Sequence, residues 1–246
     1  MKKRAFYLLV MILLLPAVTF AKEKEDDLVL ESQTVKYYKT TYNNIVSLNQ
    51  LSNNDYTTQE ISEEDYLSAK DYLESKGNGV VTTVYKRLTT SISKSGNYYQ
   101  YKAELEWLNM PSVRSFDVIA IGHLSNVQYS HGINFSQYYC ISGGGCTTTG
   151  SYYSKISSTG CGATFKLPED NLTVLKQTFY YYVTKNTSGT ITYQAAYGDY
   201  SHATSNVTST QGQDYTISTS GIVFNGTTGN YYDNISPAVA TWYGSW

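Results

Sequence analysis

The sequence is poor in charged residues, cysteine, histidine and proline. Charged residues make up 15% of its 246 residues, and the formal net charge is −2, whereas about a quarter of an average soluble protein is charged. This balance excludes a nucleic-acid-binding surface driven by bulk positive charge. The 3 Cys and 3 His are too few for a metal-rich or disulfide-dense scaffold. The 4 Pro and a hydrophobic content of 41% argue against a disordered chain.

The one long apolar run lies at the N-terminus. Lys2–Arg4 are positively charged, Ala5–Leu15 are apolar, and Pro16 interrupts the run before Thr19–Ala21, which supplies small residues for a signal peptidase site. This is the pattern of a secretory signal peptide. The run is shorter than the roughly 20 apolar residues that span a bilayer. We therefore predict a signal peptide over residues 1–21, a secreted extracellular protein and no stable membrane span.

The three cysteines of an exported chain meet an oxidising environment. Cys140 and Cys146 enclose a short loop rich in glycine, which can adopt the positive φ values of a tight ring. Three cysteines allow three single pairings, and the sequence does not decide between them. Proximity favours a disulfide between Cys140 and Cys146, which leaves Cys161 as a free thiol.

Acidic residues are concentrated near the N-terminus and divide the chain into two parts. Twelve of the 20 Asp and Glu lie between Lys22 and Lys76. Ser62–Asp65 has the composition of a helix start, and apolar residues at helical spacing follow it, so we predict a helix over about 62–76. Residues 22–59 are polar and weakly patterned, as in a flexible leader or a propeptide. The predicted division is an acidic leader over 22–78 and a β-domain over 79–246.

The clearest β-hairpin follows this helix. Polar and apolar residues alternate over 82–92, Lys94–Asn97 supplies turn residues, and the return strand covers 99–107. Strand alternation separates two faces. One face carries Tyr99, Tyr101, Ala103, Leu105 and Trp107, and the other carries Gln100, Lys102, Glu104 and Glu106.

Further short β-rich runs follow, separated by Gly, Asn and Ser turns and without alternating helices. We expect a buried strand over 115–122, a second hairpin over 178–197, and short strands over 215–218 and 221–224. This pattern predicts a mainly β protein, an antiparallel β-sandwich preceded by a short N-terminal helical segment. The alternative is two small β subdomains that divide around Gly143–Gly162.

Paired carboxylates offer one enzymatic alternative. Glu104 and Glu106 project from one face of a predicted strand, as the two carboxylates of a glycoside hydrolase can. The simpler interpretation is a solvent-facing polar stripe, because Leu108 stands where a third acid would extend the set. A secreted glycoside hydrolase that uses Glu104 and Glu106 is therefore the alternative function.

A cysteine nucleophile is the other catalytic hypothesis, with Cys161 attacking and His202 as its base. Such a cysteine normally opens a helix, whereas Pro168 and β-forming residues follow Cys161. A structural cysteine is therefore favoured. Known metal and cofactor motifs are missing from the sequence, and we expect no metal site and no cofactor.

Tyrosine is the largest compositional signal, with 26 Tyr beside 7 Phe and 3 Trp. Tyr combines apolar area with a hydroxyl group and is common on recognition surfaces, although a core built from Tyr in place of Phe explains the excess equally. A binding face would suit carbohydrate, a cell-wall polymer or a host surface. The candidate contacts are Tyr98, Trp107, Tyr180, Tyr182 and Trp242.

A pore-forming or membrane-active β protein is a second alternative function. Pore-forming toxins have amphipathic hairpins rich in Ser and Thr, and the predicted hairpin over 178–197 resembles one. An ordinary hairpin has the same pattern, so the sequence does not separate the two.

The stretches Tyr197–Ala203 and Tyr231–Ile235, together with the first hairpin, resemble uncharacterised small secreted proteins of Gram-positive bacteria. The resemblance covers the chain from about Gly79 and implies an exported bacterial protein, with no activity and no site residues attached to it. Because no catalytic constellation is complete, the sequence favours a non-catalytic protein that binds a surface.

Overall fold

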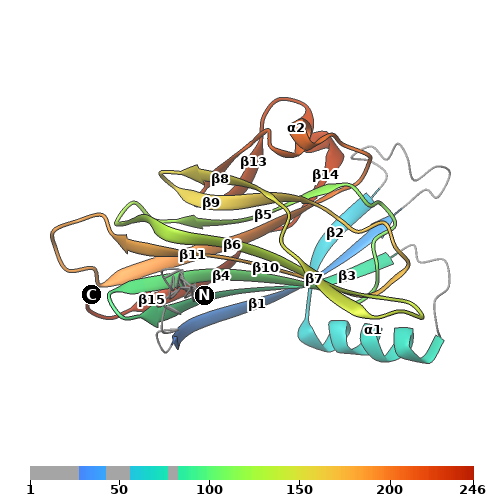
Figure 1. The fold of residues 1–246 in the computed structure, drawn as a ribbon. Helices are drawn as coiled ribbons and strands as arrows, with labels where there is room; N and C mark the ends of the chain where they lie inside the picture. The colour runs from blue at the N-terminus through green and yellow to red at the C-terminus, as the bar shows by residue number, and fades with distance from the viewer. Residues whose placement is uncertain (1–27, 43–55, 77–82) are drawn as a thin grey trace, which may run out of the picture.

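The computed structural model describes residues 28–42, 56–76 and 83–246. Two antiparallel sheets lie face to face, and a small two-stranded sheet lies beside the second of them (Figure 1). The predicted antiparallel β fold is therefore confirmed. The predicted signal peptide over 1–21 lies outside the described residues.

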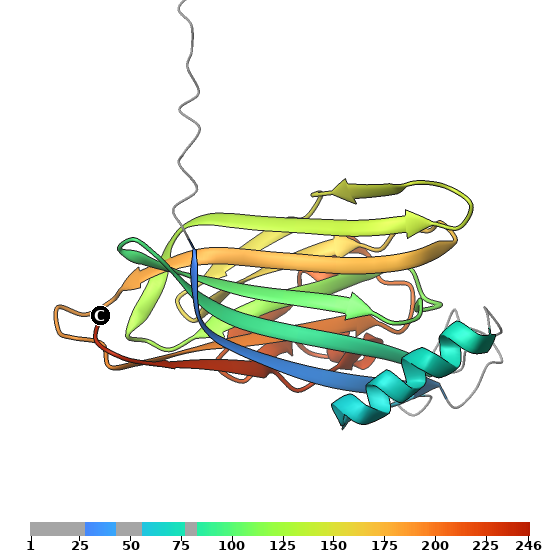
Figure 2. The ribbon, with the colours of Figure 1, turned by 90° about the horizontal axis from the view of Figure 1, so that it is seen from below.

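The first sheet has seven strands in the order β2-β1-β3-β4-β10-β6-β7, and its long strands run side by side in Figure 2. Its central hairpin is the one predicted from the sequence: Ser95 pairs with Tyr98 around a turn in which Gly96 has a φ of 56°. The strands are β1 (Val29–Tyr42), β2 (Tyr56–Ile61), β3 (Thr83–Ser95), β4 (Tyr98–Trp107), β6 (Val127–Ile141), β7 (Cys146–Thr149) and β10 (Leu172–Lys185).

The second sheet has six strands in the order β14-β11-β5-β9-β8, with β15 also paired to β11. The buried strand predicted over 115–122 is β5, and the short strands predicted over 215–218 and 221–224 form a hairpin against this sheet. The strands are β5 (Phe116–His123), β8 (Tyr153–Ser157), β9 (Gly160–Lys166), β11 (Tyr193–Ala203), β14 (Tyr232–Asn234) and β15 (Ala238–Tyr243). The smaller elements are α2 (Ser209–Gly212), β12 (Tyr215–Ser218), β13 (Gly221–Phe224) and η1 (Thr228–Tyr231).

The prediction of a second hairpin over 178–197 is wrong. β10 belongs to the seven-stranded sheet and β11 to the six-stranded sheet, so residues 186–192 cross from one sheet to the other. Ile191, in this crossing, exchanges two backbone hydrogen bonds with Trp246, of 2.9 and 3.0 Å. Alternation identifies each strand, but it does not distinguish a hairpin from a crossing between sheets, because both put apolar residues into the same core.

The larger sheet begins well before the predicted boundary at residue 79. β1 pairs with β3 from Val29 to Thr41, and β2 pairs with β1. The segment interpreted as a leader therefore supplies two strands of the sandwich. Its core-facing positions are hard to recognise from the sequence because Tyr38, Thr40 and Tyr42 occupy them in place of aliphatic residues.

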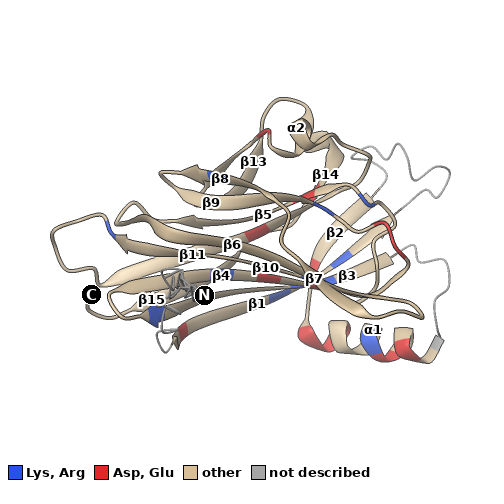
Figure 3. Ribbon diagram, viewed as in Figure 1, with Lys and Arg blue, Asp and Glu red and all other residues tan. Residues whose placement is uncertain are grey.

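Helix α1 (Glu63–Lys76) follows β2 and packs on β1 (Figures 1 and 2). Ser62 Oγ accepts a hydrogen bond of 3.1 Å from the backbone N–H of Asp65, and three acids occupy the first turn, where the helix dipole favours them. Tyr66 is buried and its ring lies 4.8 Å from that of Tyr37, whereas Tyr72 is 61% exposed. The acids of α1 contrast with strands that carry few charges (Figure 3).

The core between the two sheets is rich in tyrosine. Tyr101 and Tyr181 are fully buried, and their hydroxyl groups donate hydrogen bonds to the Gln194 side chain at 2.6 Å and to the Ile121 carbonyl at 2.8 Å. Part of the tyrosine excess therefore serves the core. Because this core draws on both sheets, the chain does not divide into two β subdomains around 143–162.

Candidate functional site

The outer face of the seven-stranded sheet carries most of the residues that the sequence singles out. On β4 the predicted alternation holds, with Lys102, Glu104 and Glu106 half-buried on this face and Tyr101 and Leu105 buried on the other. Tyr98 on β4 and Tyr180 and Tyr182 on β10 lie on the same face.

Trp107 and Trp242 do not lie on that face. They are 3% and 7% exposed and belong to the core between the sheets, so they cannot contact a partner as predicted. Strand alternation gives the physical reason for Trp107, because it points to the same side as Tyr99. Trp242 of β15 packs on the ring of Tyr99 at a centroid distance of 5.3 Å.

Four rings from three neighbouring strands form a tyrosine patch at one end of the outer face: Tyr98, His131, Tyr180 and Tyr182. His131 stacks on Tyr182 with 4.9 Å between centroids and an interplanar angle of 4°. Tyr98 meets His131 edge-on at 4.8 Å, and Tyr180 meets Tyr182 edge-on at 6.0 Å. The Gln100 amide donates a 3.0 Å hydrogen bond to the Tyr182 hydroxyl. These contacts hold the rings in one arrangement.

A bulge between β6 and β10 makes the patch possible. Tyr180 pairs with Asn134, but two residues later Tyr182 pairs with His131, so β6 contains one extra residue. Gly132 has a φ of 73°, which side chains other than glycine rarely allow. A Cβ at Gly132 would lie 2.8 Å from Cδ2 of Tyr182. Gly132 is therefore needed for the bulge and for the close approach of the Tyr182 ring.

Glu104 and Glu106 line a shallow polar hollow of about 240 Å³ on the same face. Glu106 forms an ion pair with Arg87 and lies 3.8 Å from Lys176, and Glu104 is 2.8 Å from Lys102. The two glutamate side chains are 33% and 36% exposed. A glycosidase needs one carboxyl group shielded from water so that it can act as an acid. These glutamates are instead arranged as ion-paired surface carboxylates.

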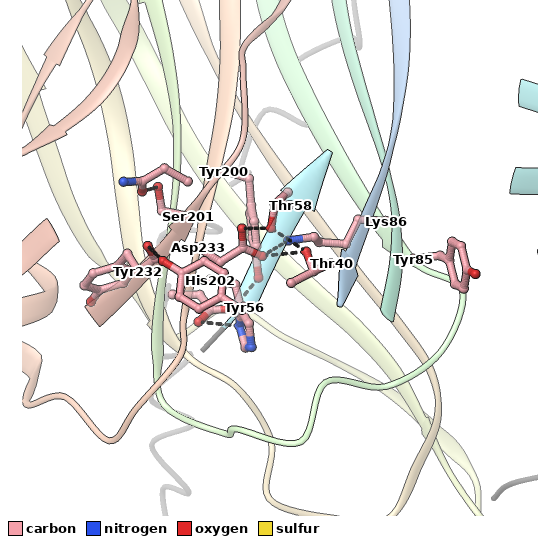
Figure 4. A network of polar contacts seen from close by, with 12 residues as sticks. Thr40, Tyr56, Thr58, Tyr85, Lys86, Tyr200, Ser201, His202, Tyr232 and Asp233 are labelled. Carbon is pink, nitrogen blue, oxygen red and sulfur yellow. Dashed lines mark hydrogen bonds and ion pairs between the residues drawn. The ribbon is translucent and has the colours of Figure 1, made fainter. Parts of the chain in front are cut away.

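A second polar cluster lies between the two sheets (Figure 4). Lys86 of β3 and Asp233 of β14 have fully buried side chains, and Nζ lies 2.5 Å from Oδ2. Thr40 donates a 2.8 Å hydrogen bond to the same oxygen, and Thr58 donates to Oδ1. Burial alone would raise the pKa of Asp233, but the Lys86 ammonium and the two hydroxyl groups outweigh it and hold this pKa below its ordinary value. Asp233 therefore rests as a carboxylate.

Asp117 of β5 organises the neighbouring part of this cluster. It accepts a hydrogen bond from the Tyr200 hydroxyl and lies 2.9 Å from Nδ1 of His202. The ring of Trp107 meets His202 edge-on at 5.0 Å, and the Lys86 ammonium lies over the same indole at 5.3 Å. Asp117 and His202 are both 0% exposed. A substrate has no access to them, and the arrangement serves the packing of the two sheets.

Cys140 and Cys146 form the predicted disulfide, which joins β6 to the edge strand β7, with their Cα atoms 4.0 Å apart. Cys161 is a free, buried thiol, and burial raises its pKa to about 12. Such a thiol is a poor nucleophile, and His202 contacts Asp117. The geometry thus agrees with a structural role for Cys161.

Two further findings concern the described ranges 28–42, 56–76 and 83–246. Within them, His, Cys, Asp and Glu form no group of three or more that could hold a metal ion. The helices in these ranges include none that is long and apolar enough to cross a membrane.

Sequence reasoning does not single out the buried cluster, although a signal for it exists. Lys86 falls between Val84 and Leu88 at the strand period of two, so alternation alone places it on the core face. Asp233 lies in a stretch that the sequence marks only by resemblance. A charged residue at a core-facing position of a predicted strand indicates a buried partner of opposite charge.

No protein-family model and no curated protein sequence matches this chain. Among solved structures, it is similar to the C-terminal domain of the AgI/II polypeptide BspA of Streptococcus agalactiae, with a TM-score of 0.31 and 8% identity over 86% of this chain and 85% of that chain. A chain named BspA_C_WT gives a TM-score of 0.32 at 8% identity, with the same coverage of both chains. The full-length major pilin SpaD of Corynebacterium diphtheriae gives 0.30 at 10% identity, over 86% of this chain and 59% of that chain. The likeness is weak, and nothing about function follows from it.

Proposed function

We propose that this chain is an exported, non-catalytic protein that binds carbohydrate on a cell wall or a host surface through its tyrosine patch. The observation that carries the proposal is the patch itself: rings from β4, β6 and β10 held in fixed geometry on the outer face of a sheet. The N-terminal signal pattern supports export, as does a disulfide at an edge of the sheet.

The chemistry of the patch suits a neutral polysaccharide. An aromatic ring offers an apolar surface to the C–H side of a sugar, and a tyrosine hydroxyl can hydrogen-bond to the sugar hydroxyl groups. Among the polar neighbours, Gln100 and Asn134 are uncharged amides, and Lys102, which lies opposite Tyr180, is ion-paired with Glu104. Small ligands are usually enclosed in concave pockets, whereas a sheet face with half-buried and exposed rings fits an extended polymer.

Binding to a panel of insoluble polysaccharides, including purified bacterial cell-wall glycan, tests the proposal. Replacing both Tyr98 and Tyr182 with alanine is expected to weaken binding about tenfold or more, because central aromatic contacts dominate such interfaces. The matched control is Tyr243→Ala, which removes a tyrosine that is 75% exposed on β15, in the other sheet. Wild-type protein that binds no member of the panel, or a control that loses as much affinity, would contradict the proposal.

A further inference from the structure

Four lysine–carboxylate pairs of the described residues have head groups within 2.8 Å of each other but differ in burial. The Lys86–Asp233 pair is fully enclosed, whereas the side chains of the other three pairs are between 25% and 69% exposed. The N–O distance is 2.5 Å for Lys86–Asp233 and for Lys166–Glu169, and 2.8 Å for Lys36–Glu60 and for Lys102–Glu104. Distance therefore does not set the buried pair apart, and burial does.

We propose that Lys86 and Asp233 condense to an intramolecular amide, which joins β3 of one sheet covalently to β14 of the other. The new bond links Nζ of Lys86 to Cγ of Asp233, and one molecule of water is released. The two residues are 147 positions apart in the sequence, so the bond would close most of the sandwich into one covalent loop.

Burial is what distinguishes this pair chemically. In water an ammonium and a carboxylate are stabilised by hydration, and condensation is unfavourable. Inside the protein both ions have lost that hydration, whereas an amide is neutral and is stabilised by ordinary hydrogen bonds. Fixed contact between the reacting groups replaces a collision in solution and supplies a high effective concentration. The water that is formed enters bulk solvent.

The reaction balances without any further reagent. A proton first moves along the hydrogen bond from Nζ to Oδ2, which gives a neutral amine and a carboxylic acid. The nitrogen lone pair then attacks Cγ, and the electron pair of the Cγ–Oδ1 double bond moves to Oδ1. The double bond re-forms as the Cγ–Oδ2 bond breaks. A second proton from nitrogen goes to Oδ2, which leaves as water.

Two threonines are placed to assist these steps. Thr58 donates a hydrogen bond to Oδ1, the oxygen that carries negative charge in the intermediate. Thr40 donates to Oδ2, the departing oxygen, at 2.8 Å, and its hydroxyl lies 2.9 Å from that of Thr58. A hydroxyl in contact with the departing oxygen can pass on the second proton. The exposed lysine pairs lie in water, where hydration stabilises the ions.

Peptide mass mapping of the full chain, digested with trypsin after denaturation and reduction, tests the proposal. We expect one cross-linked species that joins the Lys86 and Asp233 peptides and is about 18 Da lighter than their sum, the mass of one water. Trypsin should not cleave after Lys86 in this species. Linear peptides alone, with cleavage after Lys86, would overturn the proposal.

Variants locate the bond. Lys86→Met lacks the reacting nitrogen whether or not it folds, and the other variants are first shown to fold by circular dichroism, because the bond forms only in the folded core. Lys86→Met should abolish the loss of about 18 Da, whereas Lys36→Met, at the exposed pair, should retain it. Thr58→Val should lower the cross-linked fraction in freshly made protein. If Lys86→Met keeps the mass loss, the water comes from another site and the proposal fails.

Discussion

Lys86 and Arg87 are consecutive residues of β3 with acidic partners on other strands, yet they lie on opposite sides of the sheet. The Lys86 side chain is 0% exposed beside Asp233 between the sheets, and Arg87 is 41% exposed beside Glu106 on the outer face. The outer pair can exchange its contacts for water, but the inner pair cannot. Burial therefore determines whether an ion pair of this protein holds the sheets together or lies on the surface that we propose for binding.

Removing the buried cation is expected to have the largest effect. Lys86→Met leaves the Asp233 carboxylate enclosed without a counter-ion and also removes the proposed amide, so it should cost at least about 3–5 kcal/mol of the free energy of unfolding. Arg87→Met, one residue away, should cost less than about 1 kcal/mol, because water replaces the lost contact. Urea unfolding of the two variants beside the wild type measures both values. If both variants lost a similar amount of unfolding free energy, burial would not explain the difference between the two ion pairs.

Asp199 extends the comparison to a buried acid that has no ion pair with the residues that the structure describes. It accepts hydrogen bonds from the backbone N–H groups of Ile222 at 2.6 Å and Tyr200 at 2.7 Å. Burial raises its pKa to about 7, from an ordinary value of 3.8. The folded state therefore holds a proton that the unfolded state releases, so Asp199 contributes most stability below pH 3.8 and loses it as pH rises to about 7.

Between about pH 4 and 7, the free energy of unfolding should fall by an amount on the order of 3 kcal/mol because of Asp199. Chemical unfolding between about pH 4 and 7 measures it for the wild type, for Asp199→Asn and for Asp170→Asn. Asp199→Asn should remove this dependence because the amide carries no charge. The exposed Asp170 provides the control, which should retain the wild-type slope. If the unfolding free energy of Asp199→Asn fell with pH as steeply as that of the wild type, Asp199 would not be the source of the pH dependence.

The smallest expected effects concern two glycines, Gly132 in β6 and Gly143 in the turn between β6 and β7. Gly132 and Gly143 both have a φ of 73°, but a Cβ would clash with Tyr182 only at Gly132, since nothing lies within 4 Å of one at Gly143. Alanine at either position should cost about 1 kcal/mol through the backbone. We expect Gly132→Ala alone to weaken polysaccharide binding, because it displaces the Tyr182 ring. If Gly143→Ala weakened polysaccharide binding by the same factor, binding would not depend on the tyrosine patch, and the prediction would fail.

The sequence predicts the β3–β4 hairpin and its two faces because apolar and polar residues alternate there without interruption. It predicts the Cys140–Cys146 disulfide because the two cysteines are close in sequence. β1 is missed because its core positions hold Tyr38, Thr40 and Tyr42 among other polar residues. The crossing from β10 to β11 depends on which strands pair, and this is decided by the packed sheets rather than by local pattern.

The candidate site is predictable in part for similar reasons. Alternation places Tyr98 and Tyr182 on the outer face, but His131 joins them only through the bulge at Gly132, which local sequence does not mark. The same alternation places Trp107 in the core, so a surface role for it could be excluded from the strand pattern. Alternation also places Lys86 on the core face of its strand. Its partner Asp233 comes from another sheet and is identified only by the fold.

A pair of double-mutant cycles tests the central claim about burial most directly. One cycle combines Lys86→Met with Asp233→Asn, and the other combines Arg87→Met with Glu106→Gln, each followed by urea unfolding. The account predicts a coupling energy of about 3 kcal/mol or more for the buried pair and less than about 1 kcal/mol for the outer pair. Coupling energies of similar size would contradict it.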